Sequence, residues 1–325
     1  MITTVVGNYP KIPNRPRPAR LRVAIARFDR GEISEEELRR VEDEVTREVI
    51  DEQVEAGLDL VTDGQVRWDD EITYFARRLT GISIDGLERF FDNNTYYRQP
   101  VIEGTLAWGG PVTVGDYRFA AGHSPKPVKA VLTGPYTLAR LSLDQHYGSL
   151  EKLALAYAEA LNAEARALQE AGAPLVQLNE PALLKHKSDL ALFERACRRA
   201  LEGVTAEKAL YFYFGDVEGL YPQLLDLPVD TLGLDFVSGP CNWDLIDKAP
   251  FPKKLGLGIV DARNTKMETP EAVAGAVQRA LKRVPPERLY INPNCGLEFL
   301  PREVAQAKLA RMVQGIRQGV EAFFI

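Results

Sequence analysis

Polar and charged residues follow a series of short apolar runs in this sequence. They comprise carboxylates, amides, a phenol, an arginine and a cysteine: Asn8, Tyr9, Asp63, Gln65, Asn179, Glu180, Asp216, Asp235, Asp261, Arg263, Asn294 and Cys295. One Asp or Asn after a strand is a common cap or turn residue. Several carboxylates and an arginine that face one cavity need another explanation, because packed interiors rarely tolerate uncompensated charge. Such a lining suits a small zwitterionic ligand or a ligand that bears a carboxylate.

Cys295 has two interpretations. A nucleophilic cysteine needs a pKa lowered by a cation or a helix N-terminus, and a helix is predicted to begin nearby, at about Pro301. A buried cysteine also packs as a small, inert hydrophobe. We favour the packed residue and keep the nucleophile open.

The apolar runs that precede these residues predict buried strands. Their near-continuous hydrophobicity is typical of strands in an all-parallel sheet. The eight runs are Ile2–Gly7, Leu58–Asp63, Ala130–Gly134, Leu175–Asn179, Leu210–Phe214, Thr231–Val237, Lys254–Asp261 and Leu289–Asn292. The carboxyl ends of parallel strands meet at one edge, so the polar residues above are expected to converge there.

Helical segments separate the runs. Ser34 and Glu37 form a capping-box pattern before a helix that extends to about Ala56. Further helices are predicted over about 151–171, from Pro270 after a Thr269 cap, and from about Pro301 into the C-terminus. The alternation predicts an α/β fold, a (β/α)8 TIM barrel, as a single domain over residues 1–325.

One connection is longer than the others. About forty residues lie between the second helix and the third strand, and alternating runs near 112–119 favour an inserted β-hairpin over about 83–128 after strand 2. The insertion would lie at the same end as the polar residues and could wall the pocket.

Composition narrows the class of protein. The chain has 325 residues, 45% of them hydrophobic and 26% charged, as in globular proteins with a sizeable core. A net charge of -6 gives no reason to expect a nucleic-acid partner. Three scattered cysteines, no signal-peptide pattern and no long apolar run indicate a cytoplasmic protein without a membrane partner.

Several strand-end motifs also resemble one family, the cobalamin-independent methionine synthases. The resemblance covers nearly the whole chain in order, through 3–10, 60–65, 132–137, 176–183, 256–261 and 292–297. It is to the short branch with a single catalytic-type barrel. It implies methyl transfer from a folate or corrinoid donor to homocysteine or a related thiol. Gly7, Asn8, Asp63, Gln65, Asn179 and Glu180 are then expected to bind substrate.

The zinc positions depart from that family. The family's ligands are His-x-Cys after strand 5, Glu after strand 6 and Cys after strand 8. By the resemblance these positions hold Tyr211, Tyr213, Asp235 and Cys295, of which only Cys295 matches. Two phenols, one carboxylate and one thiol suit zinc poorly. We therefore predict no metal ligands and no zinc cofactor, and assign Tyr211, Tyr213 and Asp235 to substrate binding.

Other positions have lost negative charge or gained positive charge relative to the family. The family's His after strand 7 corresponds to Arg263, and two of its acids correspond to Asn179 and Gln65. Arg263 cannot release a proton near neutral pH but could hold an anion or lower the pKa of a thiol. We predict that Arg263, Asp261 and Cys295 form the catalytic group.

Three functions fit this sequence. The first is methyl transfer to a small-molecule thiol or amino acid. The second is a non-catalytic folate-binding protein, or a partner subunit of a zinc-bearing paralogous barrel or of a homo-oligomer. The third is another reaction on the same barrel, a lyase or a decarboxylase, because fold does not determine function.

Overall fold

A curled parallel sheet forms the centre of the molecule in this computed structural model, which describes residues 1–15, 17–248 and 250–321. Its seven strands follow the order β1-β10-β9-β8-β7-β6-β4. They span β1 (Ile2–Thr3), β4 (Ala130–Thr133), β6 (Leu175–Asn179), β7 (Glu207–Tyr211), β8 (Thr231–Asp235), β9 (Lys254–Val260) and β10 (Leu289–Pro293). Seven of the eight predicted strands are therefore present as named strands of one α/β sheet.

The second predicted strand makes only isolated contacts. Leu60 forms a parallel bridge with Thr4, next to β1, and Val61 forms one with Val128, before β4. Lys129 N donates to Val61 O at 3.0 Å, and Leu60 N donates to Thr3 O at 3.1 Å. The segment therefore lies between the two edge strands of the seven-stranded sheet.

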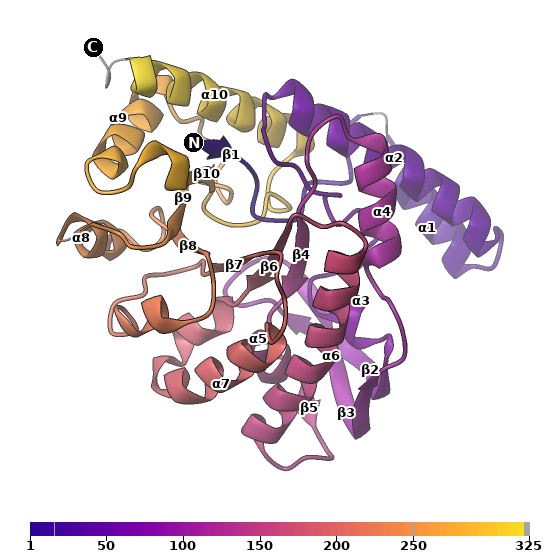
Figure 1. The fold of residues 1–325 in the computed structure, drawn as a ribbon. Helices are drawn as coiled ribbons and strands as arrows, with labels where there is room; N and C mark the ends of the chain where they lie inside the picture. The colour runs from indigo at the N-terminus through magenta and orange to yellow at the C-terminus, as the bar shows by residue number, and fades with distance from the viewer. Residues whose placement is uncertain (16, 249, 322–325) are drawn as a thin grey trace.

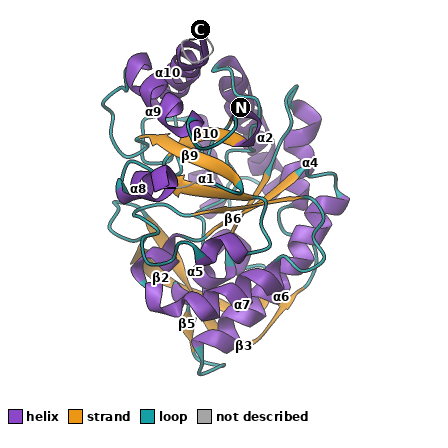
Figure 2. Ribbon diagram, turned by 60° about the vertical axis from the view of Figure 1, so that its left-hand side comes forward, coloured by secondary structure: helices purple, strands orange, loops and turns teal. Residues whose placement is uncertain are grey.

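Helices surround the sheet on its outer side, as Figures 1 and 2 show. They are α1 (Arg20–Asp29), α2 (Glu35–Glu55), α3 (Thr73–Ala76), α4 (Val114–His123), α5 (Pro135–Arg140), α6 (Leu150–Glu170), α7 (Leu190–Ala200), α8 (Cys241–Lys248), α9 (Pro270–Leu281) and α10 (Arg302–Glu321). Short 3-10 turns occur at Pro181–Lys185, Lys187–Asp189, Gln223–Asp226 and Pro286–Arg288. None of the described helices is long and apolar enough to cross a membrane.

The predicted helix starts are confirmed at two caps. The Ser34 hydroxyl accepts from Glu37 N, and the Glu37 carboxylate accepts from Ser34 N at 2.8 Å, which completes the capping box of α2. Thr269 caps α9, with Pro270 at the first helical position. At the amino-terminal ends of α2 and α9, the capping side chains accept hydrogen bonds from backbone N–H groups that have no partner within the helix.

A second sheet follows α3. Strands β2 (Leu79–Arg89) and β3 (Tyr96–Trp108) form an antiparallel hairpin, and β5 (Leu143–Asp144) pairs with β3. The sheet lies at the opposite end of the molecule from the C-terminus (Figure 2). The residues near 112–119, expected to alternate as a strand, instead form α4, where Val114 and Tyr117 are buried at helical spacing.

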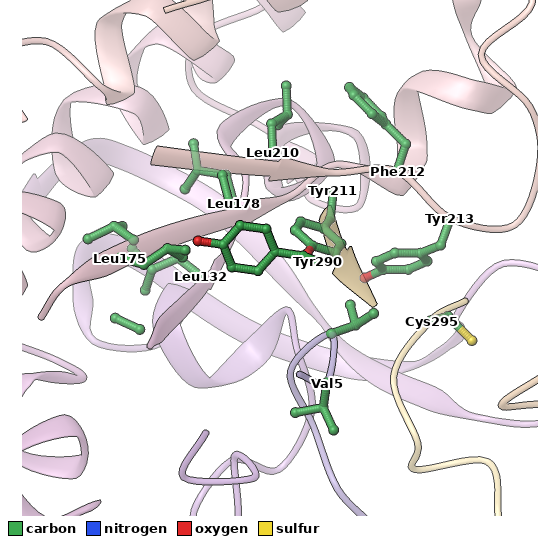
Figure 3. Close-up of a cluster of buried hydrophobic side chains, with 14 of the residues drawn as sticks. Val5, Leu132, Leu175, Leu178, Leu210, Tyr211, Phe212, Tyr213, Tyr290 and Cys295 are labelled. Carbon is green, nitrogen blue, oxygen red and sulfur yellow. The ribbon is translucent and has the colours of Figure 1, made fainter. Parts of the chain in front are cut away.

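The inside of the sheet is filled by side chains from successive strands. Tyr211 and Tyr290 point into this interior, whereas Leu132, Leu178 and Leu210 lie on the opposite face of their strands, toward the surrounding helices (Figure 3). Tyr211 lies over two neighbouring strands at Gly233 and Gly256, where a Cβ would overlap its ring or approach its hydroxyl to 2.7 Å. The interior is thus a packed core.

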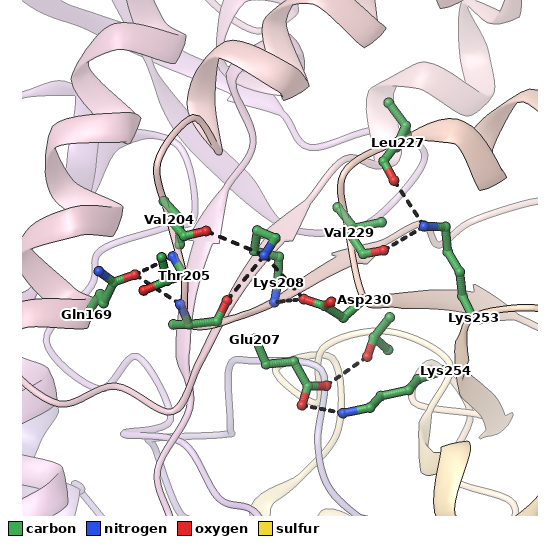
Figure 4. A network of polar contacts seen from close by, with 12 residues as sticks. Gln169, Val204, Thr205, Glu207, Lys208, Leu227, Val229, Asp230, Lys253 and Lys254 are labelled. Atoms are coloured by element: carbon green, nitrogen blue, oxygen red, sulfur yellow. Dashed lines mark hydrogen bonds and ion pairs between the residues drawn. The ribbon is translucent and has the colours of Figure 1, made fainter.

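A polar network closes the amino-terminal end of the strands (Figure 4). Glu207 on β7 accepts from Thr231 and Tyr290 at 2.9 Å each and pairs with Lys254. It therefore ties β7 to β8, β9 and β10. Lys253 donates to the carbonyls of Leu227 and Val229 at 3.0 and 2.6 Å.

Candidate functional site

A cavity of about 340 Å³ opens where β1, the Leu60–Val61 segment and β10 end. Loop residues that follow these strands line its floor, and residues of the β2–β3 hairpin form one wall. Its lining includes Asn8, Gln65, Trp68, Glu71, Tyr97 and Glu298. The volume lies within the range of small-molecule sites.

Gln65 is held in position by the turn that follows the second predicted strand. Gly64 and Gln65 have φ of +67° and +52°, and Gln65 N donates to Asp63 Oδ1 at 3.0 Å. A left-handed conformation at a non-glycine residue is uncommon and concentrates at functional sites. Gln65 is 5% exposed, and its Oε1 has no hydrogen-bond partner among the described residues.

Asn179 is oriented by the strand below it. Gln177 Nε2 donates to Asn179 Oδ1 at 2.7 Å, so the Asn179 amide nitrogen points the other way. That nitrogen would be 3.7 Å from a Cβ on Gly7, with Gln65 Nε2 at 3.8 Å. A Cβ on Gly7 would also lie 3.2 Å from Val131 Cγ1, and the role of Gly7 toward a substrate stays a prediction.

Asn8 connects β1 to a residue that sequence reasoning missed. Asn8 Nδ2 donates to Glu71 Oε1 at 2.9 Å, and Tyr213 donates its hydroxyl to Glu71 Oε2 at 3.0 Å. Glu298 lies beside Asn8, because its Oε2 and Asn8 Oδ1 both occupy the space of a Cβ on Gly296. Burial raises the pKa of both Glu71 and Glu298.

Comparison with known proteins identifies a family with the same sequence pattern. The family described as cobalamin-independent synthase, catalytic domain, matches residues 1–318. A methionine synthase of Saccharolobus solfataricus is 35% identical over 97% of this chain and 93% of its own length. A methionine synthase of Sulfurisphaera tokodaii is 34% identical over 97% of this chain and 91% of its own length.

The chain belongs to the cobalamin-independent synthase family.

A solved B12-independent methionine synthase of Shewanella, in complex with selenomethionine, superimposes on this family member with a TM-score of 0.86. It is 26% identical and covers 98% of both chains. A structure titled as a vitamin-B12-independent methionine synthase of Listeria monocytogenes has a TM-score of 0.75 at 19% identity, which supports the fold alone.

The residues at the family's zinc positions engage other partners in this chain. The Tyr211 hydroxyl donates to Asn292 Oδ1 at 3.4 Å inside the core, and its ring lies beside that of Tyr213 (Figure 3). Asp235 accepts from the backbone of Phe214, Val237 and Ser238 at 2.8 to 3.0 Å. Asn294 also donates to both of its oxygens at 3.2 Å.

Cys295, the one position that matches, is fully buried. Burial first, and then Glu298 and Asp235, raise the pKa of its thiol well above the usual value, although Arg263 acts in the opposite direction. The described residues contain no group of three or more His, Cys, Asp or Glu arranged to hold a metal. Two phenols, one carboxylate and one thiol are a poor donor set for zinc, and the absence of a zinc cofactor stays a prediction.

Two of the three predicted catalytic residues, Asp261 and Arg263, share the turn that follows β9. The guanidinium of the exposed Arg263 stacks 5.2 Å from the ring centre of Phe214. Asp261 Oδ1 accepts from Arg263 N at 2.9 Å and so holds the turn. Neither residue lines the cavity among its described walls.

Two predicted substrate-binding carboxylates contact protein groups. Glu180 accepts from Tyr136 N, Thr137 N and the Thr137 hydroxyl at 3.0, 2.8 and 2.6 Å, at the start of α5. Asp63 caps the Gln65 turn, and burial raises its pKa to about 6. Their roles toward a substrate stay predictions.

Sequence reasoning missed Glu71 and Glu298. The acidic run Asp69-Asp70-Glu71 directly follows the Asp63-Gly64-Gln65 turn, and Glu298 is three residues after Cys295. Both therefore follow strand ends, which was the available signal. Only the fold brings them together.

Proposed function

We propose that this chain catalyses methyl transfer to a thiol such as homocysteine, with a folate or a corrinoid as methyl donor. The observation that carries this proposal is the family match over residues 1–318, together with the cavity at the strand ends. The Shewanella relative is titled as a complex with selenomethionine, an analogue of the methylated product. The same cavity would bind the amino-acid acceptor.

We also propose that the fold is a complete eight-stranded barrel of one domain, with residues 83–128 as an insertion. The bridges of Leu60 and Val61 to both edges of the seven-stranded sheet support closure. The β2–β3 hairpin supports the insertion.

Amide groups would orient the acceptor. Asn179 presents its Nδ2 toward Gly7, so it would donate to a substrate carboxylate rather than accept from an ammonium. Gln65 and Asn8 would add contacts from the neighbouring strand ends. Asp235, Tyr211 and Glu180 would act by holding the loops and helix that shape the pocket.

The reaction would proceed without zinc. An unperturbed thiol is only about a few per cent ionised at pH 7, so a substrate thiol needs a nearby cation. Arg263 follows β9 at an exposed position, and its charge opposes the rise that burial causes in the pKa of the Cys295 thiol. It would do the same for a substrate thiol.

A methyl-transfer assay with metal analysis tests this proposal. Purified protein is incubated with homocysteine and methyltetrahydrofolate or methylcobalamin, and methionine is measured beside zinc content. We expect methionine formation with substoichiometric zinc, and loss of at least about tenfold in kcat/KM for Arg263→Gln. Stoichiometric zinc required for turnover would refute zinc independence, and absence of methionine with both donors would refute the activity.

A partner subunit is the second candidate. The buried, protonated Cys295 and the saturated Asp235 favour it, because neither is available to activate a thiol. Co-purification with a zinc-bearing paralogue, and methyl transfer only by the pair, would select this function over the first.

A further inference from the structure

Two carboxylates that the proposed reaction does not use share the floor of the cavity. Glu71 and Glu298 both line it, and Asn8 lies between them. Burial raises the pKa of each, and the charge of Glu71 raises that of Glu298 further. Among the described residues neither forms an ion pair with a lysine, arginine or histidine. Two neighbouring buried carboxylates without a cation are costly, so a counter-charge would stabilise them.

Three acceptors of the cavity, like the indole nitrogen of Trp68, have no hydrogen-bond partner among the described residues. Asn8 Oδ1, Gln65 Oε1 and Glu298 Oε2 are buried and lack a hydrogen-bond partner in the described part of the chain. Asn8 and Gln65 are 9% and 5% exposed. A buried acceptor without a hydrogen-bond partner is energetically unfavourable.

The two donors that contact Glu71 are already engaged. Asn8 Nδ2 and the Tyr213 hydroxyl both donate to Glu71. Lys11 is the one cationic residue among the described lining, and its Nζ donates to the carbonyl of Trp68. A ligand that brings hydrogens of its own would satisfy the three acceptors.

Aromatic side chains form the walls above this floor. Trp68 is stacked on Tyr74 with ring centres 4.9 Å apart, and Phe90 and Tyr97 stand on the hairpin side. Aromatic faces attract cations as well as apolar groups. An anionic floor beneath aromatic walls suits an organic body that ends in a cationic nitrogen.

We propose that Glu71 and Glu298 bind a cationic nitrogen that carries N–H bonds, the ammonium or amidinium end of an organic ligand, and that Asn8 and Gln65 accept its remaining hydrogens. This inference rests on the proposed function in that it concerns the same cavity, and it names the class of ligand. By resemblance, the family's acids at Gln65 and Asn179 are amides here. Glu71 and Glu298 return the negative charge at a different place.

Calorimetric titration of the full chain with matched probes tests this assignment. Benzamidine and benzylammonium supply the cation, and benzamide and benzyl alcohol are their neutral counterparts. We expect at least one cation to bind with a Kd of about 1 mM or lower, and at least about tenfold more tightly than its counterpart. Glu71→Gln and Glu298→Gln should each weaken it by about tenfold or more.

Asp69→Asn is the matched control. Asp69 also lines the cavity, but it is paired with Arg77 at the rim, so its variant should bind the cation as the wild type does. Equal binding of cation and neutral probe, undetectable binding of both cations, or an equal loss in Asp69→Asn would each refute the assignment. If one variant fails to fold, the comparison of probes on the wild-type protein still decides.

The outcome is separable from that of the proposed function, because no turnover is measured. A protein that methylates homocysteine yet does not distinguish benzamidine from benzamide refutes this inference alone. A protein that selects the cations yet forms no methionine refutes the methyl transfer alone.

Discussion

Tyr211 fills the interior of the sheet because the two strands beside it carry glycine opposite its ring. A Cβ on Gly233 would overlap the ring, and one on Gly256 would lie 2.7 Å from the hydroxyl. Burial raises the pKa of Tyr211 far above its usual range, so the phenol stays neutral in the core. Tyr211, which the family resemblance matches to a zinc ligand, thus packs in the core against the glycines of the neighbouring strands.

Gly233→Ala should therefore destabilise the protein by about 1–3 kcal/mol, because the new methyl group overpacks the core against Tyr211. Urea unfolding measures the change. The double variant with Tyr211→Leu should recover part of the loss. Gly86→Ala, where a Cβ meets nothing within 4 Å, serves as the control and should change stability far less.

Glu71 makes the stability of the free protein depend on pH. Burial raises its pKa to about 7, above the value of about 4.3 in an unfolded chain, so the folded state holds the proton more tightly. Stability contributed by this group is present below about pH 4.3 and is lost as pH rises through about 7. Asn8, Tyr213, Asp70 and Glu298 are the groups that act on it.

The difference between wild type and Glu71→Gln isolates this group from other buried acids. Between pH 5 and pH 8 the wild type should lose on the order of 1–3 kcal/mol more unfolding free energy than the variant. Denaturant unfolding at both pH values gives the two losses. Parallel pH profiles for the two proteins would contradict the raised pKa.

At the scale of elements, short helix α5 depends on one carboxylate. Glu180 follows β6 and accepts from Tyr136 N and Thr137 N, the free amides of the first turn of α5. Gly134 is required there, because its Cβ would collide with Glu180. The contact uses the positive end of the helix and fixes the loop after β4.

Glu180→Gln should lower the free energy of unfolding by about 1–3 kcal/mol, because an amide nitrogen would then face the backbone donor Tyr136 N or Thr137 N. Thermal and urea unfolding report the loss. Glu159→Gln, on the exposed face of α6, is a matched change of carboxylate to amide and should be close to neutral. A Glu180→Gln protein of wild-type stability but weakened substrate binding would instead support the role predicted from sequence.

Helices and strands could be predicted from the sequence where a single local pattern, an apolar run or a capping residue, determined them. The apolar runs located β4, β6, β8 and β9, and the Ser34 and Thr269 caps located α2 and α9. Helix α4 was missed, because Val112 to Phe119 alternates locally while tertiary packing selects the helix. The pair of Glu71 and Glu298 could not be predicted either, since it joins residues 227 positions apart whose contact depends on sheet closure.

At the scale of the whole molecule, the hairpin and the parallel sheet meet through aromatic rings. The ring centres of Phe90 and Phe91, at the turn of the hairpin, lie 6.2 and 5.7 Å from the ring centre of Phe214. Phe214 follows β7. Phe214 in turn contacts Phe299 at 6.1 Å and supports Arg263 at 5.2 Å. These contacts hold the hairpin over the mouth of the sheet, beside the cavity wall that Phe90 forms.

Phe214→Gly should separate the two parts without unfolding them. Phe214 has φ of +72°, which glycine adopts without strain, so the substitution relieves backbone strain while it removes the aromatic contacts. We expect faster hydrogen exchange in β2 and β3, unchanged exchange in β6 to β9, and weaker binding of any ligand in the cavity by about tenfold. Leu87→Ala, at a 63% exposed position of the hairpin, should change neither quantity. If hairpin exchange stayed at the wild-type rate in Phe214→Gly, the aromatic cluster would not be what holds the hairpin, and its own pairing with β5 would have to do so.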